Sequence, residues 1–420
     1  MFKRVRILLP ALAGLILLAI LLYQIPAIRS RLEWRYIVWS TYIQNVVDPV
    51  GKMPTPLPST PFATFTPRPP TSTPPATEPP TPTTPPLPAQ VSLPSPQYEK
   101  QDINNCGPAT LAMALRIYGW SGDQYDIAKI IKPADADRNV NPDELRYYVL
   151  NEAGWLRAEF RVAGDIQLLK RLLAANYPVI IEEASTLAPQ DANGPNDDLW
   201  DGHYLLITGY DDSARVFIAQ DSNQYTGGPD RKISYDQLTV DWKPFNDLYM
   251  IIYFPKDEAE VQSILGNNWN PDQNRQNALD IAQAAVTADP NDKFAWFNLG
   301  SDLVYFDRYK EAAQAFDKAF TIGLPQRMTR YQFSPFFAYY NNDQIDYLLQ
   351  LTENTYKSIN GYYSEEALLW HGYGLLRKGD ANGALADWNK ALKVHPGYCD
   401  AEQAINTYIQ PTYQLTGCSP

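Results

Sequence analysis

Apolar residues are distributed differently in successive parts of the chain. Residues 8–28 form an uncharged, largely apolar run that follows Lys3, Arg4 and Arg6. A helix of this length spans the roughly 30 Å hydrocarbon core of a bilayer. We therefore expect residues 1–30 to be an uncleaved N-terminal transmembrane signal anchor. Residues 31–52 are rich in Trp and Tyr and predict a juxtamembrane segment at the membrane interface.

Residues 53–96 lack the apolar periodicity of a packed element. They hold 17 prolines in 44 residues, interleaved with Thr and Ser. Such a composition cannot bury a core and favours extended polyproline II conformations. This stretch is predicted to be a disordered linker that holds the following domains away from the membrane.

Residues 97–256 alternate between helical and strand-like patterns. Apolar spacing predicts helices at Gly107–Tyr118, Asp143–Glu152 and Ile166–Ala175. Apolar runs typical of strands occur at Pro178–Glu182, His203–Tyr210, Val216–Asp221 and Tyr249–Phe254. Helices followed by a strand-rich second half indicate an α+β domain.

Residues 257–420 repeat a pattern of small and apolar residues every 34 to 36 positions. Ala278, Ala312 and Ala384 begin equivalent blocks, and a glycine stands twelve positions before each. Small residues at these positions let paired helices approach closely, and the period resembles that of the tetratricopeptide family. We expect an all-α tetratricopeptide repeat solenoid of four helix pairs, in which His371 and His395 have packing or surface roles.

Charge and motifs restrict the function. The formal net charge is −12, and the segment after residue 35 is more acidic still because the first 35 residues are basic. An acidic body repels phosphate backbones, so nucleic acid is an unfavourable partner. The sequence has no Cys-x-x-Cys pair, no His-x-x-x-His pair and no phosphate-binding GxxxxGK[ST] loop. We expect no metal and no cofactor.

Cys106 is the first candidate for chemistry. It stands at the predicted mouth of the Gly107–Tyr118 helix, where Asn104 or Asn105 could cap the helix. The positive end of a helix dipole favours thiolate, which is the nucleophilic form of cysteine. Burial as a small apolar residue would call for apolar neighbours, whereas the Asn-Asn-Cys-Gly context is polar. Cys399 and Cys418 are predicted to form a disulfide.

His203 and Asp221 are the next candidates. His203 begins one predicted strand, Asp221 ends the next, and Asp211-Asp212-Ser213 between them is a turn signal. A hairpin centred on Asp212 would place His203 directly opposite Asp221, with Cβ atoms about 5 Å apart. A carboxylate in that position fixes the imidazole tautomer, as the third member of a catalytic triad does.

Three motifs resemble the bacteriocin-leader-peptidase-like family of papain-fold cysteine peptidases. They are Gln101–Leu115, Gly202–Asp212 and Ile218–Ser222, in the order found in that family. The resemblance implies a papain-like fold in which Cys106 is the nucleophile, His203 the general base and Asp221 its orienter. It also implies that Gln101 donates to the oxyanion, although Gln101 stands one residue closer to the cysteine than in the family. Asn104 or Asn105 is the alternative donor.

The acidic loop Gln190–Asp201 before His203 could form one wall of a substrate cleft, although a solvated loop is the simpler interpretation. Together, the patterns predict a single-pass cell-membrane protein whose body lies on the extracytoplasmic side. It would cleave peptide or isopeptide bonds of a peptide or protein substrate through a Cys106 thioester. The repeats would bind a protein partner and contribute nothing to cleavage. The alternatives are an acyl transferase or amidase that uses the same triad, and a non-catalytic surface adaptor.

Overall fold

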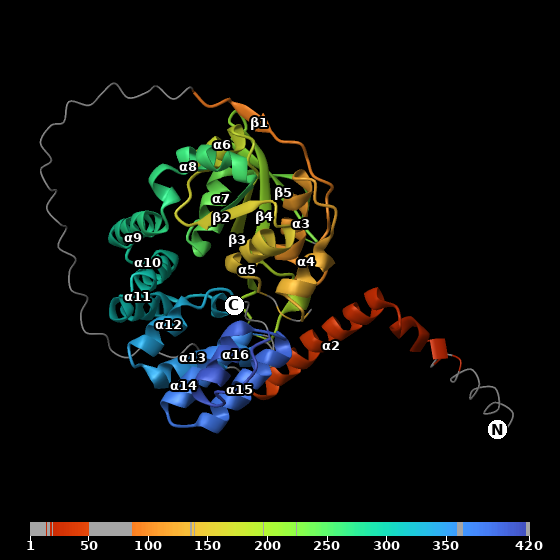
Figure 1. The fold of residues 1–420 in the computed structure, drawn as a ribbon, viewed down its shortest axis with the longest axis vertical. Helices are drawn as coiled ribbons and strands as arrows, with labels where there is room; N and C mark the ends of the chain where they lie inside the picture. Colours follow the sequence, from red (N-terminus) through yellow and green to blue (C-terminus); the bar gives the residue numbers. More distant parts are fainter. Residues whose placement is uncertain are drawn as a thin grey trace, which may run out of the picture.

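The computed structural model places two packed bodies and a long N-terminal helix (Figure 1). A mixed body of helices and strands is followed by a curved array of helices, and the helix α2 (Pro26–Val47) extends from beside the array. The structure describes residues 14, 17–18, 20–49, 86–134, 137, 139–195, 197–223, 225–358 and 364–416.

The mixed body is built on a seven-stranded antiparallel sheet. Six strands run in the order β2-β7-β3-β4-β5-β6, and β1 pairs with β4 beside this path. Their bounds are β1 Gln90–Ser92, β2 Arg157–Arg161, β3 Val179–Thr186, β4 Trp200–Asp211, β5 Val216–Asp221, β6 Gly228–Ser234 and β7 Tyr249–Tyr253.

Helices cover both faces of this sheet. Residues of α3, α4 and α5 pack on Ile180 and Leu206, whereas α6, α7 and α8 pack on Val179 and Ile181. Neighbouring strand residues therefore point to opposite cores, as the two-residue period of a strand requires. The bounds are α3 Cys106–Ile117, α4 Gln124–Ile131, α5 Pro142–Tyr148, α6 Ile166–Ala174, α7 Tyr235–Trp242 and α8 Glu258–Leu265.

Local signals explain where these helices begin. Asp165 accepts a hydrogen bond from the Leu168 amide at 2.6 Å and so caps α6. Asp123 and Asp126 form a capping box at the start of α4. Side-chain oxygens at these positions satisfy amides that have no acceptor within the helix.

The longer predicted elements match the structure closely, and the strand Val216–Asp221 has the predicted bounds. The sequence analysis missed the edge strand β6, whose sequence Gly-Pro-Asp-Arg-Lys-Ile-Ser is largely polar. An edge strand needs only one strand neighbour, so its apolar signal is weak. The predicted linker 53–96 also extends too far, because Gln90–Ser92 pair with Gly209–Asp211 as β1. Residues 50–85 lie outside the described part of the chain.

The C-terminal array is consistent with a helical repeat. Its helices are α9 Pro271–Ala288, α10 Lys293–Tyr305, α11 Tyr309–Ile322, α12 Ser334–Asn341, α13 Ile345–Lys357, α14 Glu365–Arg377, α15 Ala381–Val394 and α16 Cys399–Tyr408. Each helix from α9 onward packs on the next one along the chain.

Short turns of π or 3-10 helix occur at Val149–Ala153, Pro189–Asp191, Lys243–Phe245, Pro255–Asp257, Gly266–Trp269 and Gln326–Arg330.

Two of the three phased glycines perform the predicted packing role. A Cβ at Gly300 would lie 2.6 Å from the Phe316 ring, and one at Gly372 would lie 2.4 Å from the Trp388 indole. Gly266 differs, because it ends α8 with φ at +55° and nothing lies within 4 Å of its Cβ position. The expectation of four equivalent helix pairs was therefore wrong for the first pair, since α8 packs on the sheet instead.

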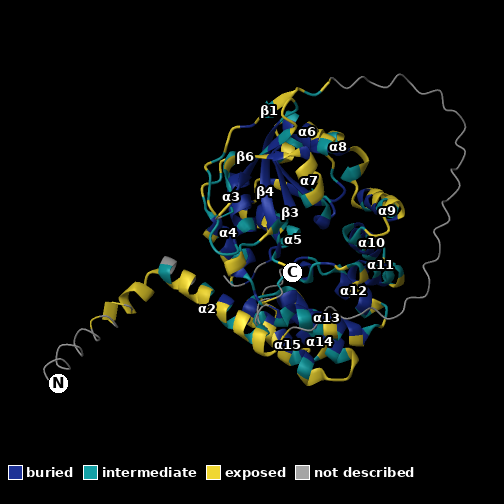
Figure 2. Ribbon diagram, turned by 180° about the vertical axis from the view of Figure 1, so that it is seen from behind, coloured by how far each residue is buried: buried dark blue, intermediate teal, exposed yellow. Residues whose placement is uncertain are grey.

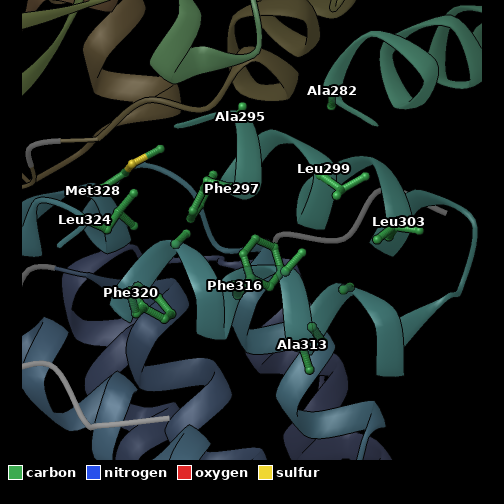
Figure 3. Close-up of a cluster of buried hydrophobic side chains, with 14 of the residues drawn as sticks. Ala282, Ala295, Phe297, Leu299, Leu303, Ala313, Phe316, Phe320, Leu324 and Met328 are labelled. Atoms are coloured by element: carbon green, nitrogen blue, oxygen red, sulfur yellow. The ribbon is translucent and has the colours of Figure 1, made fainter. Parts of the chain in front are cut away.

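One hydrophobic core joins the array to the mixed body. Phe297, Phe316 and Phe320 are central to it (Figure 3), and Trp200 and Phe245 of the mixed body belong to the same cluster. Trp200 stacks on Phe245 and meets Tyr331 of the array edge to face. The two predicted domains are therefore not separated by a linker but share buried apolar surface.

The N-terminal region differs from a simple juxtamembrane segment. Helix α2 is mostly exposed (Figure 2), yet Val38 and Thr41 are buried against the body. None of the described helices combines the length and apolar character needed to cross a membrane. The predicted span 8–28 falls partly outside the described residues, which omit 1–13, 15, 16 and 19.

Cysteine pairing follows the expected pattern as far as the described residues extend. Cys399, the first residue of α16, is disulfide-bonded, and Cys106 is a free thiol. Cys418, the predicted partner of Cys399, lies outside the described residues.

Replacing Gly300 with Ala should destabilise the array. The added methyl group would overlap the Phe316 ring, and overpacking costs about 1–3 kcal/mol, more than the gain of up to about 1 kcal/mol in helix propensity. Thermal unfolding should therefore shift down by a few degrees. Gly374→Ala is the matched control, because its neighbour is the flexible end of Leu349. Equal stability of the two variants would contradict this packing.

Candidate active site

Cys106 is the first residue of α3, and its side chain is half-buried. Thr110, one turn later, donates a hydrogen bond to the Tyr204 carbonyl at 3.1 Å and fixes α3 against β4. Asn105 is the N-cap residue but makes no side-chain capping bond, so capping by Asn105, one of the two predicted residues, was wrong. The thiol lies at the positive end of the helix dipole, because Cys106 is the first residue of the helix.

His203 lies on β4 and is 4% exposed. Its Nε2 lies 2.8 Å from Asp221 Oδ1, and the ring also forms a hydrogen bond with the Cys106 side chain. Because Nε2 faces the carboxylate, Nδ1 is the ring nitrogen available to the thiol. The structure thus brings together the three residues that the sequence analysis selected.

The predicted hairpin register was wrong, although the contact it implied is present. Strands β4 and β5 pair Asp211 with Val216, and a bulge between Ile207 and Gly209 shifts the pairing so that Leu206 faces Gln220. Continuing that register places Asp221 beside Leu205. His203 is two residues from Leu205 and so lies on the same face, which makes His203 and Asp221 diagonal neighbours.

Asp221 is completely buried but fully hydrogen-bonded. Its Oδ1 also accepts the Asn223 amide at 2.8 Å, and its Oδ2 accepts Arg231 Nη1 at 2.7 Å. The Tyr98 hydroxyl donates to its backbone carbonyl at 2.9 Å. Burial alone would raise the pKa of Asp221, but the hydrogen bond and charge of His203, with Asn223 and Arg231, lower it to about 2.

The same hydrogen bonds act on the histidine in the opposite direction. Burial disfavours the imidazolium, but hydrogen bonds to Asp221 and Cys106 outweigh it and raise the pKa of His203 to about 10. The arrangement therefore stabilises a protonated imidazole between a carboxylate and the thiol sulfur. Such a pairing favours the thiolate form of cysteine.

Sequence reasoning missed two buried glutamates beside the site. Glu183 faces His203 across the β3–β4 pair, and Arg231 Nη1 lies 3.5 Å from its Oε1. Burial, only partly offset by His203 and Arg231, raises the pKa of Glu183 to about 7. Burial, and next the charge of Cys106, hold the pKa of Glu182 well above its usual range. Two consecutive carboxylates inside the apolar strand Val179–Thr186 were the signal that could have revealed them.

Gln101 lines the same cleft as Cys106 and His203. Its amide oxygen accepts a hydrogen bond from Ser222 Oγ at 3.1 Å, and its backbone amide donates to the Ser222 carbonyl at 2.9 Å. Ser222 follows Asp221 directly, so the position of Gln101 is coupled to that of the carboxylate. Asn104, with φ at +53°, also lines the cleft, whereas Asn105 is buried.

The cleft has a volume of about 560 Å³ and draws its walls from distant parts of the chain. Arg31, Trp34 and Arg35 of α2 form one wall, and Tyr331 of the array contributes to another. Gly202 lies beside His203, where a Cβ would approach the Tyr331 ring to 2.9 Å. A larger residue there would force the Phe245 or Tyr331 ring to shift.

The acidic segment 190–201 is not a solvated loop, so that interpretation was wrong. Asp191 pairs with Arg35 of α2 at 2.9 Å. Asp197 accepts Arg327 Nε at 2.6 Å, and Asp201 accepts the Tyr331 hydroxyl. The segment attaches α2 and the array to the rim of the cleft. The prediction that the array contributes nothing to cleavage stays a prediction, although Arg327 and Tyr331 of the array contact this rim.

Comparison with known proteins supports the sequence resemblance. Residues 89–250 match the model described as the Peptidase_C39 like family. This part of the chain is similar to C39-like peptidase domains. It has a papain-like fold, and the matched range contains Cys106, His203 and Asp221. The match begins beside β1, which agrees with the ordered pairing of that strand.

Solved structures similar to the chain include two peptidases. A Bacillus anthracis protein described as a C39-like peptidase is 16% identical, with coverage of 39% of this chain and 96% of that chain and a TM-score of 0.31. Xylellain, a cysteine protease from Xylella fastidiosa, is 20% identical, with coverage of 40% and 87% and a TM-score of 0.30.

YrrB, a tetratricopeptide protein with an unusual peptide-binding site, is 19% identical, with coverage of 35% of this chain and 87% of that chain. Its TM-score is 0.19. The search of curated proteins found no match.

The His203–Asp221 pair should make stability depend on pH. The pKa of His203 is raised from 6.5 to about 10, so its contribution is complete below pH 6.5 and is lost as pH rises through about 10. The pKa of Asp221 is lowered from 3.8 to about 2, so its contribution is complete above pH 3.8 and is lost as pH falls through about 2.

The melting temperature of the protein should therefore exceed that of His203→Gln most between about pH 4 and pH 6.5. Calorimetry from about pH 3 to pH 10 measures this difference. A difference that stays constant across the range would contradict the ionised pair.

Proposed function

We propose that this chain is a cysteine peptidase that hydrolyses peptide or isopeptide bonds through a thioester on Cys106. The observation that carries the proposal is the hydrogen-bonded series Cys106–His203–Asp221 along one cleft. A nucleophile, a base and an orienting carboxylate in contact form the arrangement that activates a thiol.

The first half-reaction forms the thioester. Cys106 Sγ attacks the substrate carbonyl carbon, and the carbonyl electron pair moves to oxygen. When the oxyanion collapses, the C–N bond breaks, and His203 gives its proton to the leaving amine. In the second half-reaction His203 takes a proton from water, the hydroxide attacks the thioester carbon, and Cys106 leaves as thiolate. The products are a carboxylic acid and an amine, and the enzyme returns to its starting state.

Two groups are suited to stabilise the oxyanion. The Cys106 amide lies in the first turn of α3, where amides have no acceptor within the helix. Gln101 lines the cleft and is oriented by Ser222. Donors aimed at the developing negative charge contribute about 10²–10³-fold each to such reactions.

Two alternatives use the same domain. An acyl transferase or amidase would form the same thioester and deliver the acyl group to another acceptor, so added amine nucleophiles would divert the product from acid to amide. A non-catalytic adaptor would carry the domain as a relic, and Cys106 would not react with an epoxide that labels cysteine peptidases. Epoxide labelling at Cys106 without fluorophosphonate labelling therefore separates an enzyme from an adaptor.

We also propose that residues 8–28 anchor the protein in the cell membrane, with the peptidase domain on the extracytoplasmic side, and that the array binds a protein partner. The uncharged N-terminal run and the proline-rich stretch support the anchor. The curved array, which meets the cleft at Tyr331, supports a partner or substrate surface that continues from the active site.

Substitutions should separate the roles of the cleft residues. Cys106→Ala should abolish turnover and preserve peptide binding, because no thioester can form. Asp221→Ala should lose about 10²–10⁴-fold in kcat/KM through misorientation of the imidazole. Gln101→Ala should lose about 10²–10³-fold in kcat with little change in KM.

His203→Ala should lose the base and also slow iodoacetamide alkylation of Cys106 near neutral pH, because the thiolate loses its cationic partner. Steady-state kinetics on short peptides and alkylation rates measure these effects. His371→Ala is the control, since this histidine contacts Asp387 away from the cleft. Full activity of Cys106→Ala would overturn the mechanism.

The orientation in the membrane has its own test. Protease added to intact cells should cut within residues 50–85 and yield a fragment that contains the peptidase domain, detected by an antibody against the array. Lysed cells should give the same fragment. Cutting that occurs only after lysis would place the domain in the cytoplasm.

A further inference from the structure

A second group of functional side chains lies where the peptidase domain meets the end of the array. Glu144 comes from α5, Glu365 from the first turn of α14, and His395 from the C-terminal cap of α15. One ligand atom from each residue lies within 4.8 Å of the others. Figure 1 shows α5 at the edge of the peptidase domain that faces these last helices.

The group is acidic, with Glu365 buried and with Glu144 and His395 partly buried. Glu365 is 2% exposed, and the adjacent Glu366 is 8% exposed. Burial, followed by the charge of Glu365, holds the pKa of Glu144 well above its usual range. Burial and the charges of Glu365, Asp137 and Glu144 do the same for Glu366. Carboxylates this close disfavour one another's ionised forms.

The described contacts leave part of this charge unmatched. Glu144 accepts the Asn141 amide at 2.7 Å, and Glu366 accepts Asn141 Nδ2 at 2.8 Å. Of the three carboxylates Glu144, Glu365 and Glu366, one forms an ion pair within the described residues. Its Oε1, on Glu365, lies 3.0 Å from His395 Nδ1. Among the residues that the structure describes, none forms a hydrogen bond with the buried Oε2 of Glu365. A buried carboxylate oxygen without a partner is costly.

We propose that Glu144, Glu365 and His395 bind a divalent transition-metal cation of the Zn²⁺ type at this junction. Two carboxylates and an imidazole are a ligand set suited to such ions. An ion about 2.0–2.2 Å from each ligand would require side-chain rotations that bring the ligand atoms to roughly 3.4 Å from one another. Water or the nearby Glu366 would complete a tetrahedral shell.

An imidazole binds a metal ion through a ring-nitrogen lone pair, so the cation would take the position between His395 Nδ1 and Glu365 Oε1. The ion would then match the charges of Glu144 and Glu365 and connect α5 directly to α14 and α15. The site is structural in this proposal, since it lies outside the cleft that contains Cys106 and has no part in bond cleavage.

The experiment uses the full chain carrying Cys106→Ala, which removes a thiolate that would itself bind Zn²⁺. The protein is treated with chelator and then titrated with ZnCl₂ by calorimetry, and its melting temperature is followed. We expect one ion per chain and a rise of about 5 °C or more when Zn²⁺ is about 100 times its Kd.

Glu144→Gln and His395→Asn should each weaken Zn²⁺ binding at least about 100-fold, and His371→Asn should leave it unchanged. Glu144→Gln should also leave the metal-free protein no less stable, because the Gln side-chain oxygen can still accept the Asn141 amide. A stability loss without any change in the Zn²⁺ response would indicate a purely structural role and overturn the proposal. Absence of binding by the parent chain, or equal weakening by His371→Asn, would overturn it too.

Discussion

The buried carboxylate of Asp221 is the group on which the geometry of the cleft depends. It has no access to solvent, so each of its lone pairs must be satisfied by the protein. Its partners come from β4, the segment after β5, and β6, as His203, Asn223 and Arg231. Moving any of these elements would leave a charge unpaired in the interior. An Asp221 carboxylate without a partner in the apolar core would be costly, and this cost holds the His203 imidazole in place. The same contact fixes the orientation of the imidazole toward Cys106.

A second constraint couples the helical array to the cleft. The rim segment before β4 carries acidic side chains that would repel one another in isolation, but Arg327 and Arg35 match Asp197 and Asp191. Trp200 belongs to the apolar cluster that fills the array. Ion pairs and apolar burial thus both attach the rim segment before β4 to the rest of the protein. The array supports the rim of the cleft, and removing it would expose both the cluster and the aspartates.

Much of the fold was predictable because its signals are local. Apolar periods predicted α3, α6 and β5 almost residue for residue, and the polar surroundings of Cys106 indicated a reactive thiol. The hairpin register was not predictable, because it depends on two small local features. The turn takes in the four residues Asp212–Arg215, and a bulge near Thr208 then shifts the pairing. Asp211 stabilises this turn by accepting the Ser213 amide at 2.9 Å.

Contacts between segments that are far apart in the sequence were also not predictable. Tyr331 reaches the cleft from the array, and Glu144 meets Glu365 and His395 across the junction. No spacing rule connects residues so far apart. The buried pair Glu182 and Glu183 was visible as an anomaly in an apolar strand, but its neighbours His203 and Cys106 became clear only in three dimensions.

The attachment of α2 changes what the proline-rich segment can do. The chain is bound to the same body on both sides of residues 50–85, through the Arg35–Asp191 and Asn45–Asn193 contacts before it and through β1 after it. These flanking contacts, and not the length of the segment between them, therefore set the distance between α2 and the cleft. Helix α2 thus behaves as a ligand that the chain itself supplies to the rim of the cleft.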